Sequence, residues 1–371
     1  MSEKKIIAPF YEKLALVLVG LVALGYLVIL GKDFLDPLVF GFIFAILLLP
    51  ISNFFEKKLR LPRGAAGASA MVVLIGALYG VMYLIGSQIA KLANDWPMLR
   101  KQVGSSILQI QDWIESSFHI NMEKQMDYVH DATNKLMSSG GEVVGGTVGA
   151  LGSLMLFFVF IIIFTLLILL YRRLLFKFLL QVSGDDYQQV VYDIVENVQK
   201  ILRQYILGLL LEMFIVSCVA CSVFLFLDIK YALLLGIIVG MFNIIPYVGI
   251  FTALFLSSLV TFATGNVQQA FFVALTVICI HIVDSNVLLP TVVGSKVRLN
   301  ALLSFLGIVI GELIWGLSGM FLAIPAMAIL KIVFDRIESL KPWGLLLGSD
   351  YEPKKLSAKL PSKSPKEMDA S

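Results

Sequence analysis

The stretch 231-YALLLGIIVGMFNIIPYVGIFTALFLSSLVTFATGNVQQAFFVALTVICIHIV-283 decides the fold of this chain. It runs for 53 residues without Asp, Glu, Lys or Arg, and Gly240, Asn243, Pro246 and Gly249 interrupt it. A bilayer-spanning helix uses about 20 apolar residues, so this stretch must cross hydrocarbon more than once or fold back inside it. The sequence therefore predicts a membrane protein with broken helices.

The composition of the whole chain points the same way. Of the 371 residues, 58% are hydrophobic and 15% are charged, and the mean hydropathy is +0.89. Soluble proteins carry about 25% charged residues. The net charge of +3 is small, and Lys and Arg gather in short loops and at both ends, which indicates membrane topology rather than nucleic-acid binding. We predict an all-α, polytopic membrane protein without a nucleic-acid partner.

Four further stretches without charged residues are each long enough for one helical crossing. They are Leu14–Gly31, Pro37–Phe55, Gly64–Ala90 and Val143–Tyr171. Cationic loops follow the second and the fourth stretch, and the positive-inside tendency places both loops, and with them the N-terminus, in the cytoplasm. The cations of these loops are Lys57, Lys58, Arg60, Arg63, Arg172, Arg173 and Lys177.

Three segments are too polar to span a membrane. Residues 91–142 lie between the first three spans (1–90) and the fourth (143–171), and their apolar side chains recur at helical spacing, which predicts a small extracytoplasmic helical cap. The same spacing in residues 172–203 predicts a cytoplasmic amphipathic helix. Residues 341–371 are rich in Lys, Ser and Pro and predict a disordered cytoplasmic tail.

The second half of the chain resolves into two related units. Residues 204–265 hold a span and a hairpin hinged around Asn243–Gly249, and residues 266–340 hold a second span and a second broken hairpin. Lys296 and Arg298 fall in the cytoplasm only if the first hairpin returns to the side from which it enters. The two units are then inverted, and inverted repeats with interrupted helices typify secondary transporters. The candidates for hinges or helix breaks are Gly240, Pro290, Gly294, Gly316, Gly319 and Pro325.

Polar side chains inside these apolar stretches are candidates for a transport role. An ionised carboxylate in the membrane interior costs several kcal/mol unless it meets protein, water or a cation, and Glu212, Asp284 and Glu312 are such acids. Asn286 and His281 lie close to Asp284 in sequence, and His281 precedes it by three residues on one helical face. These residues either bind a solute or an ion, or they form a polar clamp between helices.

Three residues mark the break of the first hairpin. Pro246 removes a backbone donor and frees a carbonyl one turn earlier, while Gly249 permits close approach of the broken ends. Asn243 offers an amide that can satisfy exposed backbone groups or bind a hydroxylated solute. We expect all three in or beside the solute pathway.

Motifs of other functional classes do not occur in the sequence. It contains no Gly-x-x-x-x-Gly-Lys phosphate loop and no His-Glu-x-x-His metalloprotease motif. Cys218, Cys221 and Cys279 lie in apolar stretches without nearby His or acidic partners, where free cysteine packs as a small hydrophobe. We predict no metal, no cofactor and no enzymatic activity.

Three ordered motifs occupy the broken regions. They are 240-GMFNIIPYVG-249, then 284-DSNVLLP-290 with 294-GSKVRLN-300, then 316-GLSGMFLAIP-325. Together they resemble the autoinducer-2 exporter family of bacterial permeases, and the likeness covers essentially the whole chain. The resemblance implies about eight membrane segments with two re-entrant hairpins, an inner-membrane location with both termini cytoplasmic, and homo-oligomers such as pentamers. His281 and Glu312 depart from the pattern of this family.

The resemblance also implies a function. It predicts export of a small polar solute, such as the autoinducer-2 signal, with membrane lipid as the surrounding partner. Some relatives exchange sodium or lithium for protons, so a monovalent cation/proton antiporter is the alternative. A membrane scaffold that transports nothing is a third hypothesis from a different class.

Overall fold

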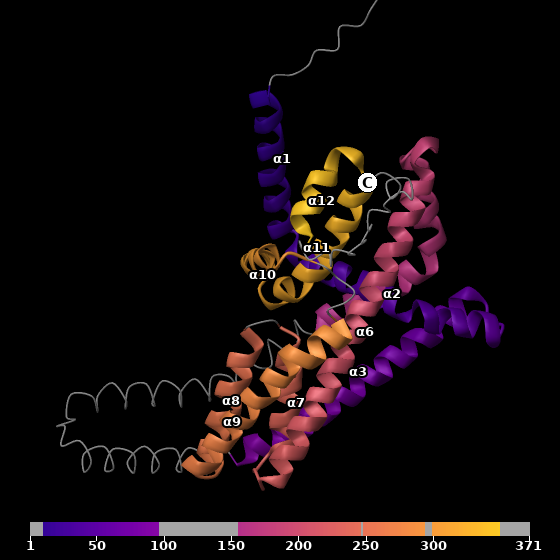
Figure 1. Cartoon of the computed structure of the whole chain (residues 1–371). Coiled ribbons are helices and arrows are strands. Elements are labelled where there is room, and N and C mark those ends of the chain that lie inside the picture. Colours follow the sequence, from indigo (N-terminus) through magenta and orange to yellow (C-terminus); the bar gives the residue numbers. More distant parts are fainter. Residues whose placement is uncertain (1–9, 96–154, 246–247, 294–298, 349–371) are drawn as a thin grey trace, which may run out of the picture.

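The computed structural model describes residues 10–95, 155–245, 248–293 and 299–348, and all the regular elements in these ranges are helices (Figure 1). The prediction of an all-α protein is therefore confirmed. In chain order the helices are α1 (Phe10–Leu30), α2 (Lys32–Lys58), α3 (Arg63–Asn94), the helix Met155–Val182, a 3-10 turn (Asp185–Tyr187), α6 (Gln188–Phe226), α7 (Ala232–Asn243), α8 (Val248–Thr264), α9 (Val267–Val283), a π-helix (Asp284–Val293), α10 (Ala301–Trp315), α11 (Leu317–Arg336), a 3-10 turn (Glu338–Leu340) and α12 (Lys341–Leu347).

Helices of two lengths make up the membrane region. Within the described ranges, six segments are long and apolar enough to cross a bilayer, namely Lys32–Lys58, Arg63–Lys91, Met155–Val182, Asp185–Phe226, Val267–Leu288 and Leu317–Arg336. The helices α7, α8 and α10 are shorter, at 12, 17 and 15 residues, compared with the roughly 20 residues of a typical membrane crossing. This mixture agrees with a polytopic membrane protein that contains interrupted helices.

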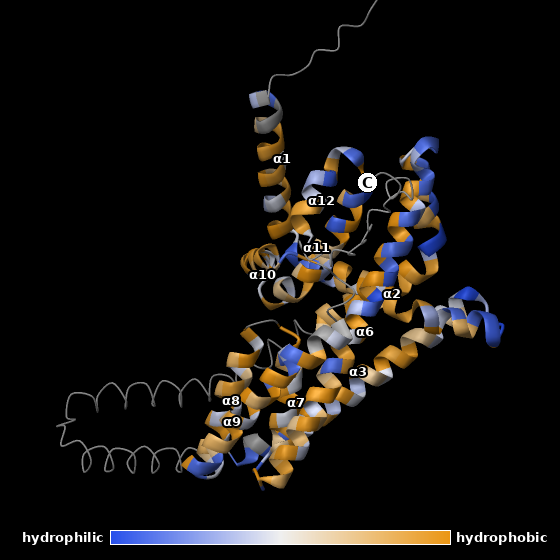
Figure 2. Ribbon diagram, in the orientation of Figure 1, coloured by the Kyte–Doolittle hydropathy of each residue, from blue (hydrophilic) through white to orange (hydrophobic). Residues whose placement is uncertain are grey.

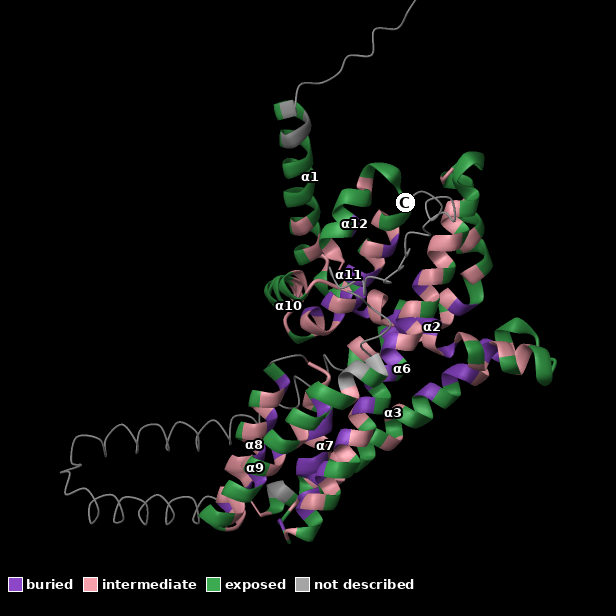
Figure 3. Ribbon diagram, in the orientation of Figure 1, coloured by how far each residue is buried: buried purple, intermediate pink, exposed green. Residues whose placement is uncertain are grey.

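The outer surface of the helices is apolar. Figure 2 shows hydrophobic residues along most of the helical ribbon, and Figure 3 shows that many of these positions are exposed. On α1, for example, Leu16 and Val22 are more than two-thirds exposed. Soluble proteins rarely expose contiguous apolar patches of this kind, because their contact with water is unfavourable. The surface therefore suits contact with lipid.

Helix α6 forms the axis on which the other helices pack. In its C-terminal half, Val216, Ala220 and Phe224 are buried against α7, α8 and α9. In its N-terminal half, Val198 and Leu202 pack against α2 and α11. Figure 1 shows the two groups of helices at opposite ends of α6. The sequence placed a boundary between an amphipathic helix and a span after residue 203, and α6 runs through that position without a break.

Glycines let α7 lie directly on α6. A Cβ atom on Gly236 would come within 2.6 Å of the backbone nitrogen of Cys221, and one on Gly240 would come within 2.7 Å of the Met213 carbonyl oxygen. Real Cβ contacts are never this short, so both positions require glycine at the present helix separation. Gly240 thus serves as a packing contact between two helices.

The second hairpin turns at Gly316, which lies between α10 and α11 with a φ of 65°. Glycine adopts this left-handed conformation without the steric penalty that other residues incur. Close to the turn, a Cβ on Gly319 would lie 1.9 Å from the carbonyl oxygen of Gly311, so the two arms touch through their backbones. Pro325 is buried, and α11 continues through it.

The predicted cap and the predicted tail lie only partly within the described ranges. The segment assigned to the cap begins at residue 91, whereas α3 continues to Asn94, and residues 96–154 lie outside the described residues. At the other end, residues 341–347 of the segment assigned to the tail form α12, which has Pro342 in its first turn and Gly344 buried near Asp335. Pro is compatible with this position because the first helical N–H groups need no intrahelical acceptor.

The Gly311–Gly319 contact generates a stability prediction. Replacing Gly319 with alanine should destabilise the purified protein by about 1–3 kcal/mol, because the added methyl group forces the hairpin arms apart. Thermal unfolding in detergent measures the change. The matched control is Gly80→Ala on α3, where a Cβ meets no atom within 4 Å. Equal melting temperatures for the two variants would contradict the close contact.

Candidate functional site

Three separate elements bring polar side chains together in the interior. Glu212 lies in the middle of α6, Asn243 is the last residue of α7, and Asp284 begins the π-helix that continues α9. Glu212 is 3% exposed and Asp284 is 4% exposed, so both residues are buried inside the protein. These three residues are the candidate functional site.

One amide group joins the two acids. The Nδ2 atom of Asn243 donates a hydrogen bond to Glu212 Oε1 at 3.0 Å and another to Asp284 Oδ2 at 3.1 Å. Because both distances are measured to the same nitrogen, the two carboxyl groups are held within a few ångströms of each other. The second oxygen of each, Glu212 Oε2 and Asp284 Oδ1, is buried and has no hydrogen-bond partner among the described residues.

The local sequence explains why Asn243 reaches this place. Gly240 lies one turn earlier on the same face of α7, and because it has no side chain, this end of α7 can lie against Met213 and Ser217 of α6, next to Glu212. Helix α7 then ends, because Pro246 follows in the sequence and restricts the residue before it to extended conformations. Gly249 allows α8 to start against the last turn of α7, since a Cβ there would lie 1.7 Å from the Phe242 carbonyl oxygen.

The Asp284 side of the site has an unusual backbone. From Asp284 to Val293 the chain forms a π-helix of ten residues, whereas most π-helical turns are single-turn bulges in α-helices and frequently occur at functional sites. The wider helix begins at the residue that enters the cluster. It therefore changes the direction of the side chains that follow Asp284.

The other polar candidates lie outside this cluster. Asn286 is exposed, and its Nδ2 atom donates to the Ile282 carbonyl oxygen at 2.7 Å, so its amide bonds its own helix. Glu312 is exposed on α10. His281 is half-buried, and its Nδ1 atom is buried without a hydrogen-bond partner among the described residues. The structure therefore joins Glu212, Asn243 and Asp284 but not these three.

Three of the candidates lie wholly or partly outside the described residues. Pro246 and Gly294 lie outside the described residues. Pro290 lies within the π-helix, and its side chain is outside the described part of the chain.

The sequence analysis missed one buried acid. Asp36 is 7% exposed on α2, but it directly precedes the apolar stretch predicted from Pro37 and was not among the candidates. The signal that could have found it is Gly31, which separates α1 from α2 and places Asp36 in the second turn of the new helix.

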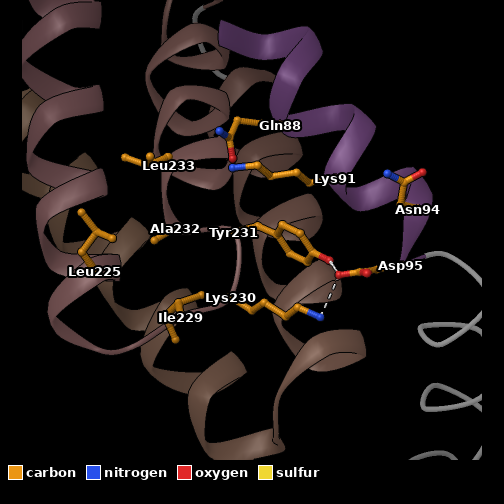
Figure 4. A pocket seen from close by; sticks show the side chains of 10 residues that line it. All are labelled: Gln88, Lys91, Asn94, Asp95, Leu225, Ile229, Lys230, Tyr231, Ala232 and Leu233. Carbon is orange, nitrogen blue, oxygen red and sulfur yellow. Dashed lines mark hydrogen bonds and ion pairs between the residues drawn. The ribbon is translucent and has the colours of Figure 1, made fainter.

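A cavity of about 510 Å³ lies at the far end of α6 (Figure 4). It is about 20 Å from Glu212, because Leu225 on its wall lies 13 residues along the helix. Its lining residues are Gln88, Lys91, Asn94, Asp95, Leu225, Ile229, Lys230, Tyr231, Ala232 and Leu233. The cavity is therefore not part of the candidate site formed by Glu212, Asn243 and Asp284.

At this cavity, Asp95 links the end of α3 to the turn before α7 through contacts with Tyr231 and Lys230. The Tyr231 hydroxyl donates to Asp95, and Lys230 Nζ lies 2.9 Å from Asp95 Oδ2 (Figure 4). The hydrogen bond from Tyr231, together with that from Lys230, holds the pKa of Asp95 below its ordinary value. Asp228 and Tyr231 both have positive φ, so these contacts also hold a turn that is unfavourable for residues other than glycine.

Asn243 should contribute to stability through its two bonds. Asn243→Leu keeps a similar volume but leaves both carboxyl groups without their donor, so we expect a loss of about 1–3 kcal/mol. Chemical unfolding in detergent measures it. In a Glu212→Gln, Asp284→Asn background the same substitution should cost clearly less, and an unchanged cost would contradict the bridging role.

The Asp95 contact should make the stability of the folded protein depend on pH. A carboxyl whose pKa is lowered in the folded state contributes stability above its unfolded pKa, and that stability is lost as the pH falls through the folded pKa. The melting temperature of the wild type should therefore drop more steeply below about pH 4 than that of Asp95→Asn. Tyr231→Phe should flatten the profile in part, and it should add nothing in the Asp95→Asn background. Parallel profiles for wild type and Asp95→Asn would argue against the contact.

Comparison with known proteins places the chain. YrrI of Bacillus subtilis (strain 168) is 26% identical over 313 residues, which cover 81% of this chain and 86% of YrrI. The AI-2 transport protein TqsA of Escherichia coli (strain K12) is 23% identical over 331 residues, covering 85% of this chain and 91% of TqsA. The profile of the AI-2E family transporters matches residues 15–339, which is nearly the whole length. The chain therefore belongs to the AI-2E family of transporters.

Proposed function

We propose that this transporter moves a small polar solute across the bacterial inner membrane by secondary transport, and that Glu212, Asn243 and Asp284 line the polar site through which the solute passes. The name of TqsA, an AI-2 transport protein, makes AI-2 the first solute to test. Export is the direction that we expect.

One observation carries the proposal, namely two buried carboxyl groups that share one amide at the end of a broken helix. Ionisable residues inside membrane segments are costly, and they occur mainly on solute, ion or proton pathways. Transporters of this kind bind their solutes where interrupted helices leave polar groups near the midplane. The break after Asn243 provides such a place.

Charge repulsion supports proton coupling at the same site. Two ionised carboxylates at this separation would repel strongly in a medium of low dielectric constant, and the neutral Asn243 amide does not cancel their charge. We infer that the pair holds one proton when it is empty. Arrival of a cation or of a solute donor at the free oxygens would then favour release of that proton.

The free oxygens also favour a second candidate function. Glu212 Oε2 and Asp284 Oδ1 are oxygen ligands of the kind that hard cations bind. Exchange of sodium or lithium for protons at this pair is the alternative to solute export. In that case the cation and the proton compete for the same two carboxyl groups.

Transport by reconstituted protein tests both functions. Vesicles that contain the full chain and a pH-sensitive dye are given gradients of AI-2, sodium or lithium. Flux above that of empty vesicles is expected for at least one of them. Glu212→Gln and Asp284→Asn should each lower this flux by at least about tenfold, which corresponds to about 1.4 kcal/mol.

Glu312→Gln is the matched control, because Glu312 is an acid in an apolar helix that is exposed and outside the cluster. Its flux should equal that of the wild type. If the variants at Glu212 and Asp284 also retain full flux, the carboxyl pair has no part in transport. Absence of flux for every gradient would remove the proposed function itself.

A further inference from the structure

The cavity at the far end of α6 has walls of two kinds. Helix α3 lines it with the polar side chains of Gln88, Lys91 and Asn94, whereas Leu225 of α6 and Leu233 of α7 line it with apolar ones (Figure 4). Its volume of about 510 Å³ lies within the roughly 300–1,000 Å³ of small-molecule sites in proteins. The two kinds of wall suit a ligand in which a polar group adjoins an apolar one.

The charges around the cavity leave one cation unbalanced. Lys230 Nζ lies 2.9 Å from Asp95 Oδ2, and the Tyr231 hydroxyl donates to the same carboxylate, so this acid is already neutralised. Within the described ranges, the ammonium group of Lys91 has no ion pair or hydrogen bond. Asp228, in the same turn as Lys230, is exposed and does not line the cavity. The wall therefore carries one net positive charge and suits an anion with one negative charge.

The cavity lies where two apolar spans end. The candidate membrane span on α3 ends at Lys91, and the one on α6 ends at Phe226, shortly before Lys230. Lysines at such positions extend their ammonium groups towards the lipid headgroups. Phe226 is 89% exposed, and Leu225 and Leu233 are also exposed, which suits contact with acyl chains rather than with water. The boundary between headgroups and acyl chains thus falls at the cavity.

We propose that this cavity binds the phosphate group of a membrane phospholipid that carries one net negative charge. Lys91 pairs with the phosphate, the amides of Gln88 and Asn94 donate hydrogen bonds to the headgroup, and the acyl chains lie along Leu225 and Leu233. Basic pockets between membrane helices bind anionic headgroups in this way. A soluble phosphate ester lacks the acyl chains, so the apolar wall favours the lipid over it.

A lipid in this place adds a second link between two elements. Asp95 already joins the end of α3 to the turn before α7. A headgroup bound to Lys91 of α3, with its chains along Leu225 and Leu233, spans the same junction. The site is about 20 Å from Glu212 along α6, so lipid binding here is separate from the carboxyl pair.

Native mass spectrometry of the purified full-length protein in detergent tests the proposal. Phosphatidylglycerol is titrated in, and the dissociation constant of the first bound lipid is measured. Lys91→Gln should raise this constant about fivefold, the loss expected for one basic residue at an anionic lipid surface. Lys91→Arg keeps the charge and should remain much closer to the wild type. Equal constants for the wild type and Lys91→Gln overturn the site, and so do equal constants for the two variants.

Lys58→Gln is the matched control. Lys58 is also an exposed lysine at the end of a span, in the last turn of α2, but it lies outside the cavity. Its substitution removes the same charge and should leave the dissociation constant unchanged. A loss equal to that of Lys91→Gln would mean that lipid follows surface charge in general, which overturns the site. Lys91 is exposed and bonds no other described residue through its side chain, so its variants should fold.

Two competing ligands identify the source of the phosphate. Phosphatidylethanolamine has the same phosphate diester but no net charge, so it should bind the wild type more weakly than phosphatidylglycerol. Glycerol 3-phosphate has no acyl chains and should not displace the bound lipid even in large excess. Its displacement of the lipid would assign the cavity to a soluble anion, and equal binding of the two lipids would refute the charge complementarity; either result overturns the proposal. None of these measurements requires flux, so their outcome is independent of the proposed transport function.

Discussion

An ionisable side chain in the membrane interior must find its partners inside the protein, and Glu212 imposes this requirement on the centre of the structure. Its partner is the amide of Asn243, which also bonds Asp284. Asn243 can reach both acids because α7 lies on α6 through Gly240 and then stops. The break in the first hairpin, the close packing of α7 on α6 and the start of the π-helix at Asp284 together make this one polar contact possible.

The packing around α6 connects this contact to the rest of the molecule. One cluster of apolar side chains contains Tyr205 and Leu209 from α6, and Ile244 beyond the end of α7 packs on it. Trp315, next to the turn of the second hairpin, packs on the same cluster. Both hairpin breaks therefore border one core.

The sequence revealed the kind of site but not its composition. Glu212 and Asp284 stood out as acids in apolar stretches, and Asn243 stood out at a break. Their association could not be predicted, because Asn243 is 31 residues from Glu212 and 41 from Asp284, and only the packing of α7 brings them together. Nearness in sequence was a poor guide for Asn286, whose amide bonds its own helix. The same limit hid the burial of Asp36, which directly precedes an apolar stretch in the sequence and is 7% exposed in the fold.

Because the Asn243 amide holds Glu212 and Asp284 close together, we infer that the two carboxyl groups share one proton. Infrared spectroscopy of the purified protein tests it directly, because a protonated carboxyl group has a stretching band separate from that of a carboxylate. If the pair holds one proton, the wild type shows one such band at neutral pH, and the band persists in Glu312→Gln and disappears in the Glu212→Gln, Asp284→Asn double variant. A wild-type spectrum without this band, or a band that survives the double substitution, would contradict it.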